Sequence, residues 1–305
     1  MTKKFNLVVL LLAFFGVYTH VDAQSESFKS PVITDEMTVN PDQNREWRAG
    51  QSKYSAKPKN MWEVGVHVGR FSISGDIPTT LFPGWGAGIH LRKAINYALS
   101  VRVNAMYGTT KGFDDRFSSA SIISLEQLPN VGSITNGMYR NYKNTTITGS
   151  IEGVLNIGNI LFHKERNKWN LYTAVGVGFA SIDTRVNNVK NGAIINWESL
   201  NLDPNASYAD NVKKLKDAMD SDYETKVGNN RDVSGLFDNG KNALTIPFTV
   251  GVSRKLTKRV NLSLEHTYYW ADYDAWDGFV YRSAFDQSND SDNGQYTSLR
   301  LGINL

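Results

Sequence analysis

The segment Trp62-Glu-Val-Gly-Val-His-Val-Gly69 decides the fold, because apolar residues alternate along it with polar residues or glycine. Successive side chains of a β-strand point to opposite faces of the sheet. The alternation therefore predicts a strand over Trp62–Phe71 with one apolar face and one polar, glycine-lined face.

Seven further segments repeat this alternation, and they are Trp85–Arg92, Tyr97–Tyr107, Thr145–Ile157, Trp169–Phe179, Ala243–Ser253, Val260–Trp270 and Gln295–Leu305. In the sixth, Pro247 is predicted on the polar face, where it removes a ladder donor. The lengths match the ~9–11 residues with which a tilted strand crosses a bilayer. We therefore predict an all-β fold, an eight-stranded antiparallel transmembrane β-barrel. A soluble barrel also alternates, but its apolar face points inward.

The N-terminal residues predict export. Lys3 and Lys4 precede the short apolar run Leu7–Val17, so residues 1–23 are expected to be a cleaved signal peptide. The run is too short to favour the alternative of an uncleaved anchor. Residues 24–60 show no periodicity and are predicted to be a mostly extended periplasmic tail, with a plug or partner-binding strap as the alternative. Residues 61–305 are assigned to the barrel domain.

Composition limits the function classes. The formal net charge is only +3, which argues against a nucleic-acid partner. The chain has no cysteine, which excludes disulfides and thiolate metal sites. No zinc spacing, phosphate-binding glycine loop or nucleophile elbow is present, so we expect no cofactor, no metal and no catalytic residues.

Connection lengths predict the orientation. Residues 93–96, 158–168 and 254–259 are short connections, whereas residues 111–140, 182–242 and 271–294 are long. Outer-membrane barrels keep short turns in the periplasm and long loops outside the cell, so both termini are expected in the periplasm of a Gram-negative cell. A short amphipathic helix is predicted over Ser207–Asp220, lying over the barrel mouth. A receptor-binding helix is the alternative.

Aromatic residues are predicted to form girdles at the two membrane interfaces. The inner girdle is Trp62, Tyr97 and Trp169, and the outer one is Trp85, Tyr107, Tyr142, Phe179, Tyr268, Trp270 and Tyr296.

Six charged residues fall on the inward face, and they are Glu63, Arg92, Arg102, Glu152, Glu265 and Arg300. The interior of an eight-stranded barrel is about wide enough for side chains alone, and buried ions must be paired. We therefore predict a salt-bridge network that fills the lumen. A conductive pore lined by the same residues is the alternative.

Two other kinds of site were considered. His266 falls on the outward face, where a lipid-modifying enzyme would need a serine and a carboxylate beside it, but Ser263 and Glu265 are predicted to point inward. The acidic segments Asp272–Asp277 and Asp286–Asp292 offer oxygen ligands for calcium, but they do not match an EF-hand loop. Solvated loop charge is the preferred interpretation of both segments.

Three segments carry a family resemblance, namely residues 62–69, 83–92 and 298–305. Together they resemble the OmpA-like outer-membrane β-barrel family, from about Trp62 to the end of the chain. The resemblance implies the barrel fold, contact with outer-membrane lipid and, during insertion, contact with the barrel-assembly machinery. For the function we expect a non-enzymatic integral outer-membrane protein with a structural or surface-interaction role, whose long loops offer a site to an extracellular ligand. The assembly machinery usually reads an aromatic final residue, whereas this chain ends in Leu305, and no peptidoglycan-binding domain is carried over.

Overall fold

The computed structural model describes residues 41–51, 62–96, 98–119, 137–158, 169–200, 202–226, 242–257, 259–271, 276–279 and 292–305. The chain divides into residues 1–37 and 38–305, and the first unit lies wholly outside the described residues. The predicted signal peptide and Tyr97 lie outside them too, and the domain boundaries remain predictions. Within the described ranges, no helix is both long enough and apolar enough to cross a membrane.

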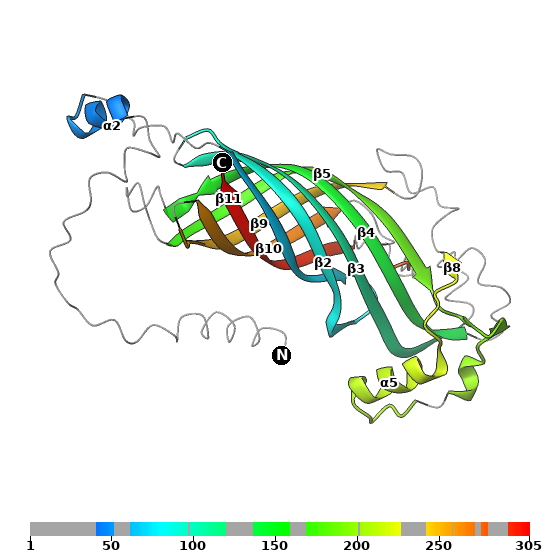
Figure 1. The fold of residues 1–305 in the computed structure, drawn as a ribbon. Coiled ribbons are helices and arrows are strands. Elements are labelled where there is room, and N and C mark those ends of the chain that lie inside the picture. The colour runs from blue at the N-terminus through cyan, green and yellow to red at the C-terminus, as the bar shows by residue number, and fades with distance from the viewer. Residues whose placement is uncertain are drawn as a thin grey trace, which may run out of the picture. The chain divides into compact units, whose positions relative to one another are not determined.

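Eight long strands form the second unit (Figure 1), and they are β1 (Trp62–Ser74), β2 (Thr79–Ala94), β3 (Leu99–Ser119), β4 (Gly137–Asn156), β5 (Trp169–Val186), β9 (Asn242–Lys255), β10 (Val260–Ala271) and β11 (Asn293–Asn304). Each strand pairs antiparallel with its neighbours in the order β4-β3-β2-β1-β11-β10-β9-β5, and β4 also pairs with β5. This last pairing closes the sheet. The predicted eight-stranded antiparallel barrel is confirmed.

The first strand of the barrel, β1, pairs with its last strand, β11. Glu63 lies opposite Asn304 in the β1–β11 register, and the amide of Leu305 donates to the Trp62 carbonyl at 3.0 Å. β1 therefore begins at the mouth of the barrel where β11 ends, and this opening is called the near mouth below. The opposite opening is called the far mouth.

The predicted inward position of Pro247 is confirmed, because its side chain is buried. Between β5 and β9 the paired residues run to Val175 opposite Phe248 and resume at Gly178 opposite Thr245. The interruption spans Pro247, whose nitrogen carries no hydrogen to donate. On its other side Pro247 stays in register with Tyr269 of β10.

Several strands extend beyond their predicted ends, and β3 and β4 extend the furthest. The segment 111–140, predicted to be a loop, contains the last residues of β3 and the first of β4, and the predicted boundary was therefore wrong. A cluster of apolar and aromatic residues covers the extension, including Phe113, Met138 and Tyr142, each 2% exposed or less. Tyr142 was predicted on the outer girdle, but it points inward because it shares the inward alternation of Thr146.

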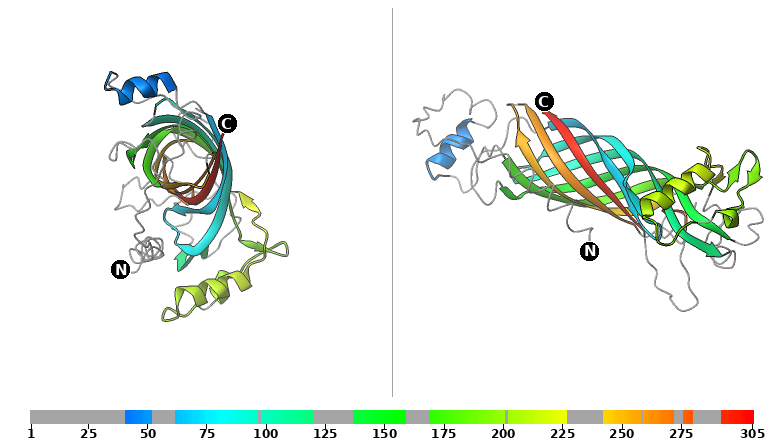
Figure 2. Two further views of the ribbon diagram at one scale, coloured as in Figure 1. Left: turned by 60° about the vertical axis from the view of Figure 1, so that its left-hand side comes forward. Right: turned by 90° about the horizontal axis from the view of Figure 1, so that it is seen from below.

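The predicted amphipathic helix is present as α5 (Tyr208–Ala218). Ser207 caps its N-terminus, since its side chain accepts from the Asp210 amide at 3.2 Å. Val212 and Leu215 are buried, as helical spacing requires. The Tyr208 hydroxyl donates to the Phe113 carbonyl at 2.8 Å, so α5 packs beside the end of β3 (Figure 2). The predicted position of the helix over the barrel mouth was therefore wrong.

Several short elements complete the described chain, and they are α2 (Pro41–Arg48), β6 (Val189–Lys190), β7 (Ala193–Ile194), η2 (Trp197–Ser199) and β8 (Thr225–Lys226). The helix α2 lies within the predicted tail, most of which lies outside the described residues, so the expectation of a mostly extended tail stays a prediction. Pro41 suits the first helical position, and Asp42 in the first turn complements the helix dipole. A strand-or-helix periodicity search does not detect so short a helix.

Candidate functional site: the barrel lumen and its outer wall

The centre of the lumen holds an ion-pair network made by four of the six predicted residues. Arg102 donates from Nε to Glu152 Oε2 at 2.9 Å and from Nη1 to Glu265 Oε1 at 2.8 Å. Arg300 Nε lies 3.0 Å from the same Glu265 oxygen, an ion pair whose angles do not make a hydrogen bond. All four residues are 4% exposed or less. Two cations thus neutralise two anions away from solvent.

Neutral side chains complete this network. The Tyr172 hydroxyl donates to Glu265, and the Ser150 hydroxyl donates to Glu152 Oε1 at 2.7 Å. Arg300 Nη1 donates to Asn104 Oδ1 at 3.1 Å. Ser150 and Asn104 share the predicted inward alternation of Glu152 and Arg102. Tyr172 was missed, although its place beside the outward Leu171 marks it as inward.

Glu63 organises a second group nearer the near mouth. Its Oε2 accepts from Arg92 Nη2 at 2.8 Å and from Asn261 Nδ2 at 2.7 Å. His90 Nε2 lies 3.3 Å from Oε1 of the same carboxylate. The Arg92 side chain is 23% exposed, so this pair is only partly withdrawn from water. The six predicted charges are therefore divided between two groups.

A histidine–tyrosine pair lies on the same inward face. His67 Nδ1 is 2.9 Å from the Tyr296 hydroxyl, which itself donates to the Gly86 carbonyl at 3.1 Å. Both His67 and His90 are 3% exposed, and their inward positions follow the predicted alternation. Tyr296, predicted on the outer girdle, is fully buried because it shares the inward alternation of Arg300.

The segment Trp276–Phe279, called the plug below, fills the far mouth. Trp276 and Phe279 are 0% exposed. Trp276 Nε1 donates to Thr146 Oγ1 at 2.8 Å, and the Trp276 carbonyl accepts from Asn144 Nδ2 at 2.9 Å and Thr184 Oγ1 at 2.8 Å. Side chains of β4 and β5 thus hold the plug inside the wall. Sequence reasoning missed it, since a loop has no periodicity.

The plug carries a buried carboxyl. Asp277 Oδ2 accepts from the Ile77 amide at 3.0 Å, and its own amide donates to Asp292 Oδ2 at 3.0 Å. Burial and the neighbouring Asp76 carboxylate raise the pKa of Asp277 to about 7, although hydrogen bonds from backbone amides and the charge of Arg140 oppose the shift. The plug therefore contains a group that titrates near neutral pH.

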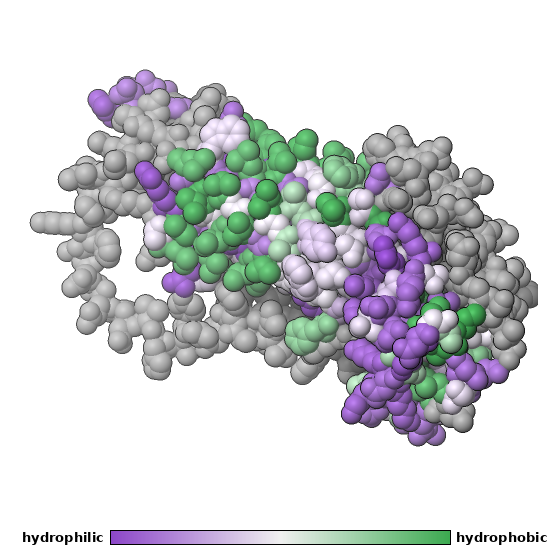
Figure 3. All heavy atoms as spheres, turned by 45° about the vertical axis from the view of Figure 1, so that its right-hand side comes forward, coloured by the Kyte–Doolittle hydropathy of each residue, from purple (hydrophilic) through white to green (hydrophobic). Residues whose placement is uncertain are grey.

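The outward residues of the same strands are apolar and exposed (Figure 3). Large outward side chains that are at least half exposed are Val66, Val68, Trp85, Ile89, Val103, Ile147, Ile151, Val175, Val177, Phe179, Phe248 and Trp270. Monomeric soluble proteins rarely expose contiguous apolar patches of more than a few hundred Å². An apolar wall on all sides of a barrel indicates a face made for a non-aqueous environment.

Within the described ranges, the residues considered for an enzyme or metal site do not come together. His266 lies on the outer face with Nδ1 2.8 Å from Thr297 Oγ1, whereas Ser263 and Glu265 are buried in the lumen. The two acidic segments lie mostly outside the described residues. Among the residues that the structure does describe, no group of three or more histidine, cysteine or acidic side chains has the arrangement to hold a metal ion.

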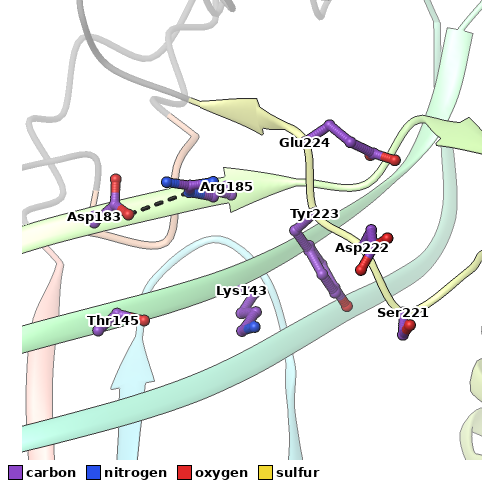
Figure 4. A pocket seen from close by; sticks show the side chains of 8 residues that line it. All are labelled: Lys143, Thr145, Asp183, Arg185, Ser221, Asp222, Tyr223 and Glu224. Atoms are coloured by element: carbon purple, nitrogen blue, oxygen red, sulfur yellow. Dashed lines mark hydrogen bonds and ion pairs between the residues drawn. The ribbon is translucent and has the colours of Figure 1, made fainter. Parts of the chain in front are cut away.

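An open pocket of about 460 Å³ lies where the far ends of β4 and β5 meet residues 221–224 (Figure 4). Asp183 in its wall pairs with Arg185 Nε at 3.2 Å and with Lys226 Nζ at 3.0 Å. Its charged groups include both signs and largely compensate one another. The pocket presents no arrangement of nucleophile, base and acid.

Comparisons with known proteins find remote structural likeness only. No family model matches the chain, and the search of curated proteins finds no match. Neisserial surface protein A is 10% identical with a TM-score of 0.38, over 80% of this chain and 97% of its own. The N-terminal β-barrel domain of Pseudomonas aeruginosa OprF is 8% identical with a TM-score of 0.35, over 81% and 98%. Ail of Yersinia pestis, solved with the heparin analogue sucrose octasulfate, is 10% identical with a TM-score of 0.34, over 80% and 98%.

Proposed function

We propose that this chain is an integral outer-membrane β-barrel with a non-conducting lumen and a structural or surface-interaction role. The observation that carries the proposal is the opposition of the two faces. Outward residues such as Val66 and Val177 are 56% and 62% exposed, while the inward Arg102 and Glu265 are ion-paired and nearly inaccessible.

The apolar wall supports a membrane location. Each Å² of apolar surface withdrawn from water contributes roughly 25 cal/mol, so a lipid environment stabilises this face and water does not. Closure of the sheet leaves no unpaired strand edge, which is the condition for strands in hydrocarbon. Outer-membrane lipid is thus the proposed solvent of the wall.

The filled lumen supports a structural role over solute transport. The central ion pairs cross the interior between β3, β4, β10 and β11, and the plug occupies the far mouth. A solute would have to displace both. The extensions of β3 and β4, with α5 packed on them, then form the surface that is offered to an extracellular ligand.

Conductance of the purified protein in planar bilayers tests the sealed lumen. The expected result is insertion, monitored independently by protease protection, without persistent unitary currents. Stable unitary conductance would establish the porin alternative, and the lumen residues would then line a pore.

Surface proteolysis of intact cells tests the orientation. We propose that both termini lie in the periplasm and that the far mouth faces the outside. Cleavage is expected within residues 182–242, with the terminal residues protected. Protection of that segment and cleavage near the termini would invert the orientation.

A further inference from the structure

One charged side chain follows the row of outward aliphatic residues on β1. Along β1 the outward residues Val64, Val66 and Val68 are followed by Arg70. Val68 is 57% exposed, and its register partner Leu299 on β11 is 49% exposed. Arg70 thus stands one step beyond a pair of aliphatic residues that face outward.

Two polar side chains on adjacent strands share this position. Thr297 of β11 is the register partner of both Arg70 on β1 and His266 on β10. His266 Nδ1 lies 2.8 Å from Thr297 Oγ1, which leaves Nε2 of the ring as its other polar atom. A guanidinium, a hydroxyl and an imidazole therefore follow one another across three strands on the outer wall.

Arg70 has no anionic partner among the described residues. Its Nε is buried and has no hydrogen-bond partner in the part of the chain that the structure describes. By contrast, Arg102 and Arg300 in the centre of the lumen are both ion-paired. Among the residues that the structure describes, nothing neutralises the arginine on the wall, and it is open to an anionic ligand.

The position of Arg70 on the wall indicates the chemical class of the ligand that pairs with it. Two residues along a strand span about 7 Å, which is roughly 5 Å along the membrane normal when the strand is tilted by about 40°. Arg70 therefore lies about 5 Å beyond the last valine of β1, on the side where the lipid headgroups begin if the wall has the proposed membrane location. Arginine binds phosphate through a bidentate fork, and a hydroxyl and an imidazole add hydrogen bonds.

We propose that Arg70, Thr297 and His266 form a binding site for the phosphate of an anionic outer-leaflet lipid headgroup. The inference rests on the proposed membrane location of the wall. The phosphate accepts from the guanidinium and the Thr297 hydroxyl, while the acyl chains of the same lipid lie against Val68 and Leu299. Recognition thus combines one charged contact with the apolar wall below it.

The test uses the full chain in phosphatidylcholine nanodiscs that contain diphosphorylated lipid A or its dephosphorylated form, with retained lipid counted by native mass spectrometry. The wild type is expected to retain the phosphorylated lipid selectively. Arg70→Gln is expected to weaken that retention by at least about tenfold, the loss of a charge-assisted pair. Inorganic phosphate at millimolar concentration is expected not to displace the lipid, because it lacks the acyl chains.

Lys93→Gln is the matched control. Lys93 also lies on the outer wall, but at the other end of the barrel, where its Nζ sits 5.0 Å from the centroid of the Trp62 ring. This variant removes the same charge and is expected to keep the lipid preference. Equal losses in both variants would assign the effect to net charge and overturn the proposed site.

Two further outcomes separate the inference from the proposed function. If the chain enters the nanodiscs but does not distinguish the two lipids, the site is wrong and the membrane location stands. If the chain does not enter bilayers at all, the proposed function fails first. Should Arg70→Gln not fold, Thr297→Val is the second variant. A weaker preference for the phosphorylated lipid than in the wild type supports the site, and an unchanged preference overturns it.

Discussion

The outer and inner faces of each barrel strand differ in residue type and in exposure. Val66 and His67 are neighbours in β1, yet Val66 is 56% exposed and His67 only 3%. The outer face is apolar and makes non-directional contacts. The inner face is polar, and its contacts have fixed partners and geometry. One backbone thus presents two surfaces suited to two environments, and the alternation of residue types assigns each side chain to one of them.

This difference predicts unequal tolerance to substitution. Apolar contacts with a fluid depend on area, so one aliphatic residue replaces another at little cost. A buried ion pair depends on its partner, and removal of one member leaves an uncompensated charge. The inner face should therefore be the more sensitive of the two.

The largest effect is expected for Arg102→Met, which leaves Glu152 and Glu265 without their shared cation. Breaking a buried pair costs about 3–5 kcal/mol. The free energy of unfolding, measured by urea titration in lipid vesicles, should fall by that amount. Arg92→Met is the control, because Arg92 is partly exposed, and it should cost clearly less. Equal losses of free energy in Arg102→Met and Arg92→Met would show that burial of the ion pair does not determine the cost of breaking it.

On the outer face, Val66→Arg is expected to cost about 2–4 kcal/mol if Val66 lies near the bilayer midplane. The same titration in vesicles measures it, with Val66→Leu as the apolar control at nearly no cost. An arginine tolerated as well as leucine would mean that the wall does not face hydrocarbon.

A smaller effect is expected at the plug, which contacts the inner face at the far mouth. Trp276→Phe keeps an aromatic ring but removes the donor to Thr146 Oγ1. A net loss of about 1 kcal/mol should appear as faster amide hydrogen exchange in residues 276–279. Phe279→Tyr adds a hydroxyl without removing a donor and serves as the comparison. Unchanged exchange in Trp276→Phe would show that this hydrogen bond does not hold the plug.

The last prediction concerns pH. The raised pKa of Asp277, about 7 against an ordinary value of 3.8, means that the folded plug binds a proton more tightly than the unfolded chain does. Its stabilising contribution is therefore greatest in acid, and it is lost as the pH rises through about 7. Exchange of the plug amides, corrected for intrinsic rates, should increase from pH 5 to 8. Asp277→Asn should flatten that profile, and an identical profile in the variant would contradict the assignment to Asp277.

Much of the barrel is predictable from sequence because period-two alternation is a local signal. It places Glu265 inward and His266 outward without knowledge of any partner, and both are found there. It also corrects the girdle assignment: Tyr142 and Tyr296 are inward because they share the alternation of Thr146 and Arg300. The error came from ranking residue type above position.

Other features depend on contacts between distant segments. The plug is anchored by hydrogen bonds from Asn144 and Thr184 to Trp276, over separations of 132 and 92 residues. The extension of β3 is stabilised by α5, about a hundred residues later in the chain. No local pattern carries that information. Arg70 was visible in the sequence, but its lack of an anionic partner among the described residues became evident only when the neighbouring strands were placed beside it.

The central claim is that hydrocarbon covers the outer wall and side chains fill the inside. Because the chain has no cysteine, single spin labels can be placed at Val66, Ile151 and Val175 and, for comparison, at Ser150, each as a cysteine substitution in phosphatidylcholine vesicles. Collision with oxygen should dominate at the three outward sites, and neither oxygen nor a water-soluble nickel complex should reach the label at Ser150. Ready collision of the nickel complex with the three outward labels would contradict the account.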